Sequence, residues 1–286
     1  TGIVIGSSLV GLRPIITHQR VEFSLLSVEQ LFNQAAKWNY MTDGKQNLPI
    51  VIRLVIGRGW GQGPQHSQSL ESIFAHIPGL KVVAPSSPYD AKGLIISSIE
   101  DNNPTIIFEH RWLFNYEDYV PNKFYKIPIG KANLVTKGRD ITIVSFSYAS
   151  VESFNASKIL KKFGIDVELV DLRTIRPLDH ETIYKSVRKT KRLIVVDNGF
   201  RSFSVSSEII SSVVENLFSI LLKPPIRIAN KDMPIPSSRE LAKYCYPTKY
   251  DIVTSALKLM DLDKKIEYED SKFSSDIPDQ DFKGPF

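Results

Sequence analysis

Residues 49–68 read PIVIRLVIGRGWGQGPQHSQ, and this stretch joins a strand to an unusual loop. Its first nine residues form a β-branched apolar run bounded by loop signals, which is typical of a buried strand. Four glycines then stand at alternate positions from Gly57 to Gly63. Because glycine costs conformational entropy on folding, such a run favours a loop that approaches a ligand or moves. A plain surface turn is the other interpretation.

Strands and helices alternate on both sides of this stretch. Apolar residues at helical spacing run from Ser24 to Asn39, a helical segment of about ten residues is expected after the loop, and the alternation restarts near residue 141. Further strands are expected at residues 80–84, 105–109, 141–146, 167–171, 193–197 and 226–229. The pattern predicts an α/β protein of two domains, each a mostly parallel sheet flanked by helices.

The domain boundaries follow from where this alternation stops and resumes. We expect a first domain at residues 1–112, an irregular linker at 113–128, a second domain at 129–262 and a flexible acidic tail at 263–286. The chain starts without Met and already in a helical pattern, which suggests that a segment upstream is missing.

Composition excludes several classes of protein. The 286 residues are 42% hydrophobic and 23% charged, which is typical of a globular protein, and no stretch is long and apolar enough to span a membrane. Cys245 is the only cysteine, which favours a reducing, cytoplasmic setting. The basic run at 185–192 is better explained as a solvated helix end than as a nucleic-acid site, so neither nucleic acid nor membrane is expected as a partner.

His66 is the strongest chemical candidate in the sequence. It ends the glycine-rich loop after a predicted parallel strand, at the sheet edge where ligands bind in α/β proteins. There it could act as an acid, a base or an oxyanion donor, or it could be an exposed capping residue. The chain contains no HExxH, no G-x-S-x-G and no phosphate-binding G-x-x-x-x-G-K-[ST]. Residue patterns alone therefore predict two α/β domains with a loop beside a ligand, and they do not specify the ligand.

Seven segments, taken in order and spacing, resemble one family. They lie at residues 11–14, 33–37, 65–68, 78–83, 90–94, 101–104 and 171–179. Over residues 1 to about 260 the chain resembles the beta subunit of the first component of thiamine-diphosphate-dependent 2-oxo acid dehydrogenases, such as pyruvate dehydrogenase. Bacterial beta-like proteins of the broader transketolase group fit equally well.

The resemblance implies a pyrimidine-binding domain followed by a transketolase C-terminal domain. In that family the cofactor lies between the pyrimidine domain of one subunit and a diphosphate-binding domain of another, which carries a Gly-Asp-Gly motif for magnesium. No Gly-Asp-Gly occurs in this chain. The resemblance therefore implies an alpha subunit that holds the diphosphate and magnesium, self-association in a heterotetramer, and a lipoyl-bearing acyltransferase as a candidate acceptor.

Site residues are carried over position by position. Phe23 matches the aromatic residue that packs on the aminopyrimidine ring, and His66 matches the active-site histidine facing the substrate. Arg20 and Trp60 are substrate-side candidates, and Arg20 would suit an acidic substrate. Four further residues match a potassium-holding loop that acts largely through main-chain carbonyls: Ile50, Ser98, Asp101 and Asn103.

The family's catalytic glutamate is the main departure. By alignment it belongs upstream of Thr1, and no acid of this chain obviously replaces it. Glu22 neighbours Phe23 but is expected to face the opposite way, because the segment is taken as extended.

Three functions remain open. The first is a 2-oxo acid dehydrogenase or decarboxylase, in which the cofactor acts as an electron sink and His66 handles protons or stabilises an oxyanion. The second is ketol transfer, as in a split transketolase or deoxyxylulose-phosphate synthase, with phosphate held by Arg20, Arg58 and His18. The third is a truncated, non-catalytic partner subunit.

Overall fold

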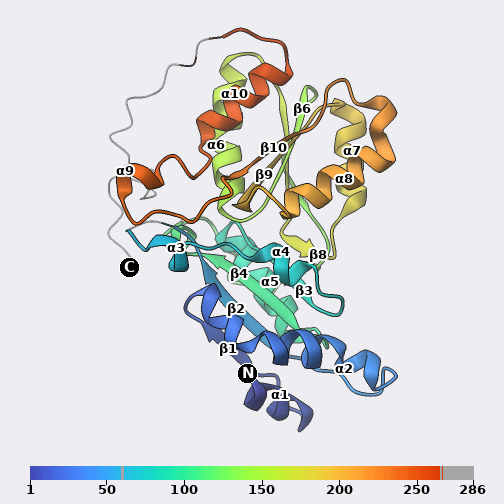
Figure 1. Cartoon of the computed structure of the whole chain (residues 1–286). Coiled ribbons are helices and arrows are strands. Elements are labelled where there is room, and N and C mark those ends of the chain that lie inside the picture. Colours follow the sequence, from blue (N-terminus) through green and yellow to red (C-terminus); the bar gives the residue numbers. More distant parts are fainter. Residues whose placement is uncertain (59–60, 265, 267–286) are drawn as a thin grey trace.

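The computed structural model describes residues 1–58, 61–264 and 266. The chain folds into two five-stranded sheets that lie one above the other in Figure 1, with helices packed around each. The N-terminal part supplies most of the lower sheet, and the part after residue 130 supplies the upper one.

The first sheet has the strand order β1-β2-β4-β3-β8. Its strands are β1 (Ile15–His18), β2 (Val51–Ile56), β3 (Lys81–Val83), β4 (Thr105–His110) and β8 (Thr174–Arg176). All neighbours pair in parallel except β3 and β8, which are antiparallel. Strand β2 lies inside the sheet between β1 and β4, and most of its residues are buried apolar side chains, as the β-branched run predicted.

The second sheet has the strand order β10-β9-β6-β7-β5. Its strands are β5 (Asn133–Thr136), β6 (Ile141–Ser145), β7 (Val167–Asp171), β9 (Leu193–Phe200) and β10 (Ile226–Asn230). Only the edge strand β5 is antiparallel to its neighbour. Strands β6 and β7 are buried along their full length, because helices cover both faces of the sheet.

Helices of the first half are short and irregular near the N-terminus. They are α1 (Gly2–Leu9), η1 (Val21–Ser27), η2 (Glu29–Ala35), α2 (Ala36–Met41), α3 (Gly63–His66), α4 (Glu71–Ala75), α5 (Pro88–Glu100) and η3 (Arg111–Leu113). Element η1 is a 3-10 helix and η2 is a π-helix. The Ser87 side chain caps α5 by accepting from the Asp90 amide at 3.1 Å, so the helix begins where the Ser-Ser-Pro sequence predicts.

Helices of the second half are longer. They are α6 (Tyr148–Lys162), α7 (His180–Thr190), η4 (Phe218–Ile220), α8 (Val205–Leu217), α9 (Arg239–Ala242) and α10 (Lys249–Leu259). The basic run lies in the last turn of α7, where Arg188 and Lys189 face the negative end of the helix dipole.

The two halves share one apolar core. The largest buried cluster includes Leu54 and Phe108 of the first sheet and Val144 and Val170 of the second. Strand β8 leaves the second half to pair with β3, and Arg173 forms an ion pair with Asp90 at 2.6 Å. The chain therefore holds the sheets together by packing, by backbone pairing and by buried charge.

The predicted fold class is confirmed: both sheets are mostly parallel and flanked by helices. Three details differ. The ten-residue helix expected after the glycine-rich loop is two short helices, and the antiparallel strands β5 and β8 were not predicted because each has only three or four residues. Most of the tail lies outside the described residues. None of the described helices has the length and apolar run that a membrane crossing requires.

Candidate active site

The candidate site lies at the carboxyl edge of strands β1 and β2. These strands are parallel neighbours, with Ile16 opposite Ile52, so both end at the same edge of the sheet. Element η1 begins at Val21, three residues after β1 ends, and α3 ends at His66 after the loop that follows β2. Ligands of open α/β sheets bind at this edge, so the topology brings η1 and α3 to a suitable place.

Phe23 and His66 meet there. Their ring centroids are 5.9 Å apart and the planes are inclined at 67°, an edge-to-face contact. Phe23 is 47% exposed and the His66 side chain is 40% exposed. Two residues that are 43 positions apart therefore share one open surface, as the resemblance requires of an aromatic shelf and an imidazole.

Glu22 faces His66, contrary to the sequence expectation. The Nδ1–H of His66 donates a hydrogen bond to Glu22 Oε1. The expectation was wrong because it took the segment as extended, whereas residues 21–27 form a 3-10 helix. Successive side chains of a 3-10 helix are about 120° apart, so Glu22 and Phe23 can both approach His66.

A signal for this helix was present in the sequence. The buried residues of η1 are Val21, Ser24 and Ser27, spaced by three as the 3-10 period requires. The apolar pattern used for the prediction started at Ser24, so it missed the first turn.

Two buried polar atoms next to these strands lack a hydrogen-bond partner among the described residues. They are Oε2 of Glu22 and Nε2 of His18, the last residue of β1. Burial lowers the pKa of His18. Buried polar atoms in proteins nearly always have a partner, so a ligand with polar groups fits this place.

Arg20 precedes η1 and is half-buried. Burial lowers the pKa of its guanidinium, and the Glu22 carboxylate partly offsets that effect. Trp60 lies outside the described residues. Arg58, the third member of the phosphate cluster expected with Arg20 and His18, is 8% exposed, and its guanidinium packs on the rings of Trp112 and Tyr246.

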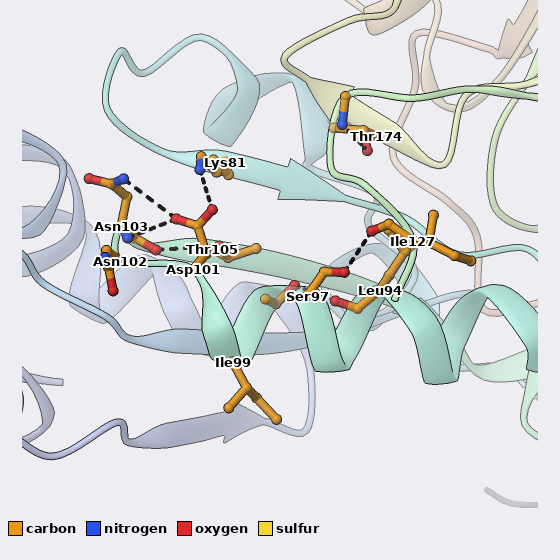
Figure 2. Close-up of polar contacts among 12 residues, drawn as sticks. Lys81, Leu94, Ser97, Ile99, Asp101, Asn102, Asn103, Thr105, Ile127 and Thr174 are labelled. Atoms are coloured by element: carbon orange, nitrogen blue, oxygen red, sulfur yellow. Dashed lines mark hydrogen bonds and ion pairs between the residues drawn. The ribbon is translucent and has the colours of Figure 1, made fainter. Parts of the chain in front are cut away.

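The residues of the potassium loop lie near the start of β4 (Figure 2). Asp101 Oδ1 accepts from the Asn103 amide at 2.8 Å, and its Oδ2 pairs with Lys81. Ser98 Oγ donates to a helix carbonyl at 2.7 Å, and the Ile50 carbonyl accepts from the strand β4 amide at 3.0 Å. Because these side-chain oxygens have protein partners, a potassium ion here would depend on backbone carbonyls.

Arg13 donates hydrogen bonds to two main-chain carbonyls of this turn, one of which belongs to Asp101. Its Nη1 donates to the carbonyl oxygens of Ile99 and Asp101, both at 2.9 Å, and its Nη2 donates to Asn102 Oδ1 at 2.6 Å. The turn after α5 is thus built around a guanidinium cation.

Comparison with known proteins agrees with the geometry. The family model of the transketolase pyrimidine-binding domain matches residues 1–116, and that of the transketolase C-terminal domain matches residues 130–252. The chain is 41% identical over 259 residues to the acetoin:2,6-dichlorophenolindophenol oxidoreductase subunit beta of Cupriavidus necator, covering 91% of this chain and 77% of the relative.

Pyruvate dehydrogenase subunits are equally similar. Identity is 42% over 260 residues to the mitochondrial E1 component subunit beta-1 of Oryza sativa subsp. japonica, covering 90% of this chain and 70% of that one. Identity to the mitochondrial E1 component subunit beta of Bos taurus is 39% over 266 residues, covering 91% of this chain and 74% of that one. The chain belongs to the family of E1 beta subunits of 2-oxo acid dehydrogenases.

The E1 beta fold is also that of split transketolases. A split gene transketolase, solved as an inactive beta4 tetramer, superimposes with a TM-score of 0.74 at 20% identity, over 92% of this chain and 81% of the other. At this identity the likeness concerns the fold alone. Among the described residues of this E1 beta chain, no group of three His, Cys, Asp or Glu side chains could hold a metal ion.

A buried carboxylate pair lies beyond the glycine-rich loop, where α4 meets the end of β9. Glu71 is 1% exposed, and burial together with the charge of Asp197 raises its pKa to about 8. Asp197 accepts from the amides of Gly199 and Ser206, each at 2.8 Å, and burial raises its pKa as well. The pair therefore carries less than two negative charges at neutral pH.

Proposed function

We propose that this E1 beta chain contributes the pyrimidine end of a thiamine diphosphate site and an active-site histidine to an enzyme that acts on a 2-oxo acid. The observation that carries the proposal is the cluster of Glu22, Phe23 and His66 at the carboxyl edge of the first sheet. A half-exposed aromatic ring beside a buried, unpartnered carboxylate oxygen suits a flat heterocycle with amino groups.

The chemistry divides between cofactor and chain. When bound, thiamine diphosphate supplies the carbanion and electron sink that decarboxylation of a 2-oxo acid needs. Phe23 offers a face for the aminopyrimidine ring. Because His66 donates from Nδ1 to Glu22, its Nε2 is the atom that takes up or returns a substrate proton, and the carboxylate stabilises the imidazolium that forms.

A partner completes this proposed site. We infer an alpha subunit that holds the diphosphate and magnesium, in a heterotetramer with paired beta subunits, because this chain has no Gly-Asp-Gly and its relatives are named as beta subunits. A lipoyl-bearing acyltransferase is the proposed acceptor, and potassium at the loop of Asp101 is a structural ion in this account. The single cysteine favours the cytoplasm.

Turnover in the assembled enzyme tests the proposal. The chain, including any upstream segment, is combined with its alpha partner, thiamine diphosphate and magnesium, and release of carbon dioxide from a set of 2-oxo acids is measured. We expect turnover that falls at least hundredfold with His66→Ala. An exposed histidine, changed as His76→Ala, is the matched control. Absence of turnover and of cofactor binding would favour a non-catalytic subunit, and activity on sugar phosphates alone would favour ketol transfer.

A further inference from the structure

The glycine-rich loop packs against one segment of the second domain. Gly61 and Gly63 have φ of +69° and +71°, a region that residues with a side chain rarely adopt. A Cβ placed on Gly61 would lie 3.1 Å from the carbonyl oxygen of Ser237, and one on Gly63 would lie 2.5 Å from Ser237 Oγ. In Figure 1, α3 and α9 lie close together on the same side of the molecule. These glycines therefore allow a close approach to a particular surface.

Arg58, at the start of the loop, touches the same segment. Its guanidinium carbon is 4.2 Å from the ring centroid of Tyr246, and it also lies 4.6 Å from Trp112 and 5.8 Å from Tyr148. Arg58 is 8% exposed, and no described carboxylate pairs with it. A cation over the face of an aromatic ring is attracted by the ring quadrupole, so these rings stabilise the buried guanidinium.

The supporting segment has its own apolar anchor. A small buried cluster packs beneath it against Phe200 at the end of β9, and it consists of Ile235, Ala242, Cys245 and Tyr246. Ser237 and Tyr246 are therefore attached to the second sheet, although the loop they touch belongs to the first domain.

We propose that residues 235–246 form a platform that positions His66, with Ser237 against Gly61 and Gly63 and with Tyr246 against Arg58. The inference rests on the proposed role of His66. Glu22 orients the imidazole from the side of the first domain, and the platform sets the distance of the loop from the second domain. Ser237, Tyr246 and Arg58 are positioning residues, because none of the contacts described for them is with Glu22, Phe23 or His66.

A rescue experiment in the assembled enzyme separates positioning from general stability. Gly63→Ala adds a methyl group directed at Ser237 Oγ, and Ser237→Ala removes that oxygen. We expect Gly63→Ala to lower kcat at least tenfold with cofactor affinity within about twofold, since misplacing a catalytic group by 1 Å can cost about a hundredfold. Ser237→Ala alone lowers kcat less than Gly63→Ala does, because the main-chain contact of Ser237 with Gly61 remains. The double variant recovers at least threefold of the lost kcat, and the rest of the loss reflects the strain of alanine at a φ of +71°.

Three outcomes overturn the platform. They are an unchanged kcat for Gly63→Ala, a loss that Ser237→Ala does not rescue, or a loss of cofactor affinity in parallel with kcat. If Gly63→Ala does not assemble with its partner, Arg58→Met tests the same proposal. This variant must lower kcat at least fivefold. Combined with His66→Ala, it must leave kcat at the value of His66→Ala alone. Full activity of His66→Ala would refute the proposed function itself, whereas a loss with His66→Ala and none with Gly63→Ala or Arg58→Met would refute only the platform.

Discussion

His66 Nδ1 and Glu22 Oε1 are joined by a hydrogen bond between residues 44 positions apart in the chain. The bond fixes which imidazole nitrogen carries the proton, and it directs Nε2 away from the carboxylate. It also links the ends of two neighbouring strands, because Glu22 follows β1 and His66 follows β2. In our account the catalytic histidine is therefore oriented by Glu22, an acid that the sequence analysis expected to face the opposite way.

Removing the charge of Glu22 tests that link. Glu22→Gln keeps the size of the side chain and loses the carboxylate that stabilises the imidazolium. We expect kcat to fall by about tenfold to a hundredfold with cofactor affinity nearly unchanged. Steady-state kinetics of the assembled enzyme and a cofactor titration measure both quantities. The control is Glu29→Gln at the start of η2, where the acid is exposed. Equal activity of the two variants would contradict the assigned role.

Replacing Phe23 should weaken cofactor binding more than it slows proton transfer. Phe23→Ala removes a ring face worth about 1–3 kcal/mol for a stacked heterocycle, so the dissociation constant for thiamine diphosphate should rise by about fivefold to a hundredfold. Saturating cofactor should then restore much of kcat. Phe218→Ala, at a phenylalanine that is 74% exposed, is the matched control. A kcat defect that excess cofactor cannot restore would point to a different role for this ring.

Glu71 should make stability depend on pH. Its pKa in the folded chain is about 8, above its value of 4.5 in the unfolded chain, so the folded state binds more protons between these values. The contribution of Glu71 to the free energy of unfolding is complete below about pH 4.5 and is lost as pH rises toward 8, by up to about 1.4 kcal/mol per pH unit. We expect the midpoint temperature of thermal unfolding to decrease as the pH is raised from 6 to 8. In the Glu71→Gln variant this decrease should be smaller. A slope that is the same in both proteins would contradict the burial argument.

Arg20 provides a test of substrate charge. A half-buried guanidinium close to Glu22 should favour a 2-oxo acid with a second carboxylate, since a charged hydrogen bond is worth about 1.5–3 kcal/mol. Arg20→Gln should raise KM for such a diacid at least tenfold and leave KM for pyruvate within about twofold. Arg139→Gln, at an exposed position in the second domain, should change neither. A uniform change across substrates would show that Arg20 has no part in selection.

The sequence predicted the architecture well, because the signals that specify parallel strands are local. The apolar β-branched runs of β2 and β6 appear in the structure as buried strands, and the resemblance predicted the proximity of Phe23 and His66. Strand β8 could not be predicted in the same way. It has three residues and is defined by pairing with β3 of the other half, which is a tertiary contact.

The part of the site that the sequence did not reveal depends on backbone conformation. An extended and a 3-10 segment differ in whether Glu22 and Phe23 share a side, and residue types alone did not distinguish them. The glycines of the loop were recognised as a device for close approach, but Ser237 lies 174 positions beyond Gly63, and no local pattern connects the two.

The most direct measurement is a crystal structure of the chain with its alpha partner, thiamine diphosphate and magnesium. Our account predicts the aminopyrimidine ring within about 4 Å of the Phe23 ring, beside Glu22 and His66, with the diphosphate and metal bound by the partner. An aminopyrimidine ring bound anywhere else, with Phe23 and His66 free of both cofactor and substrate, would contradict it.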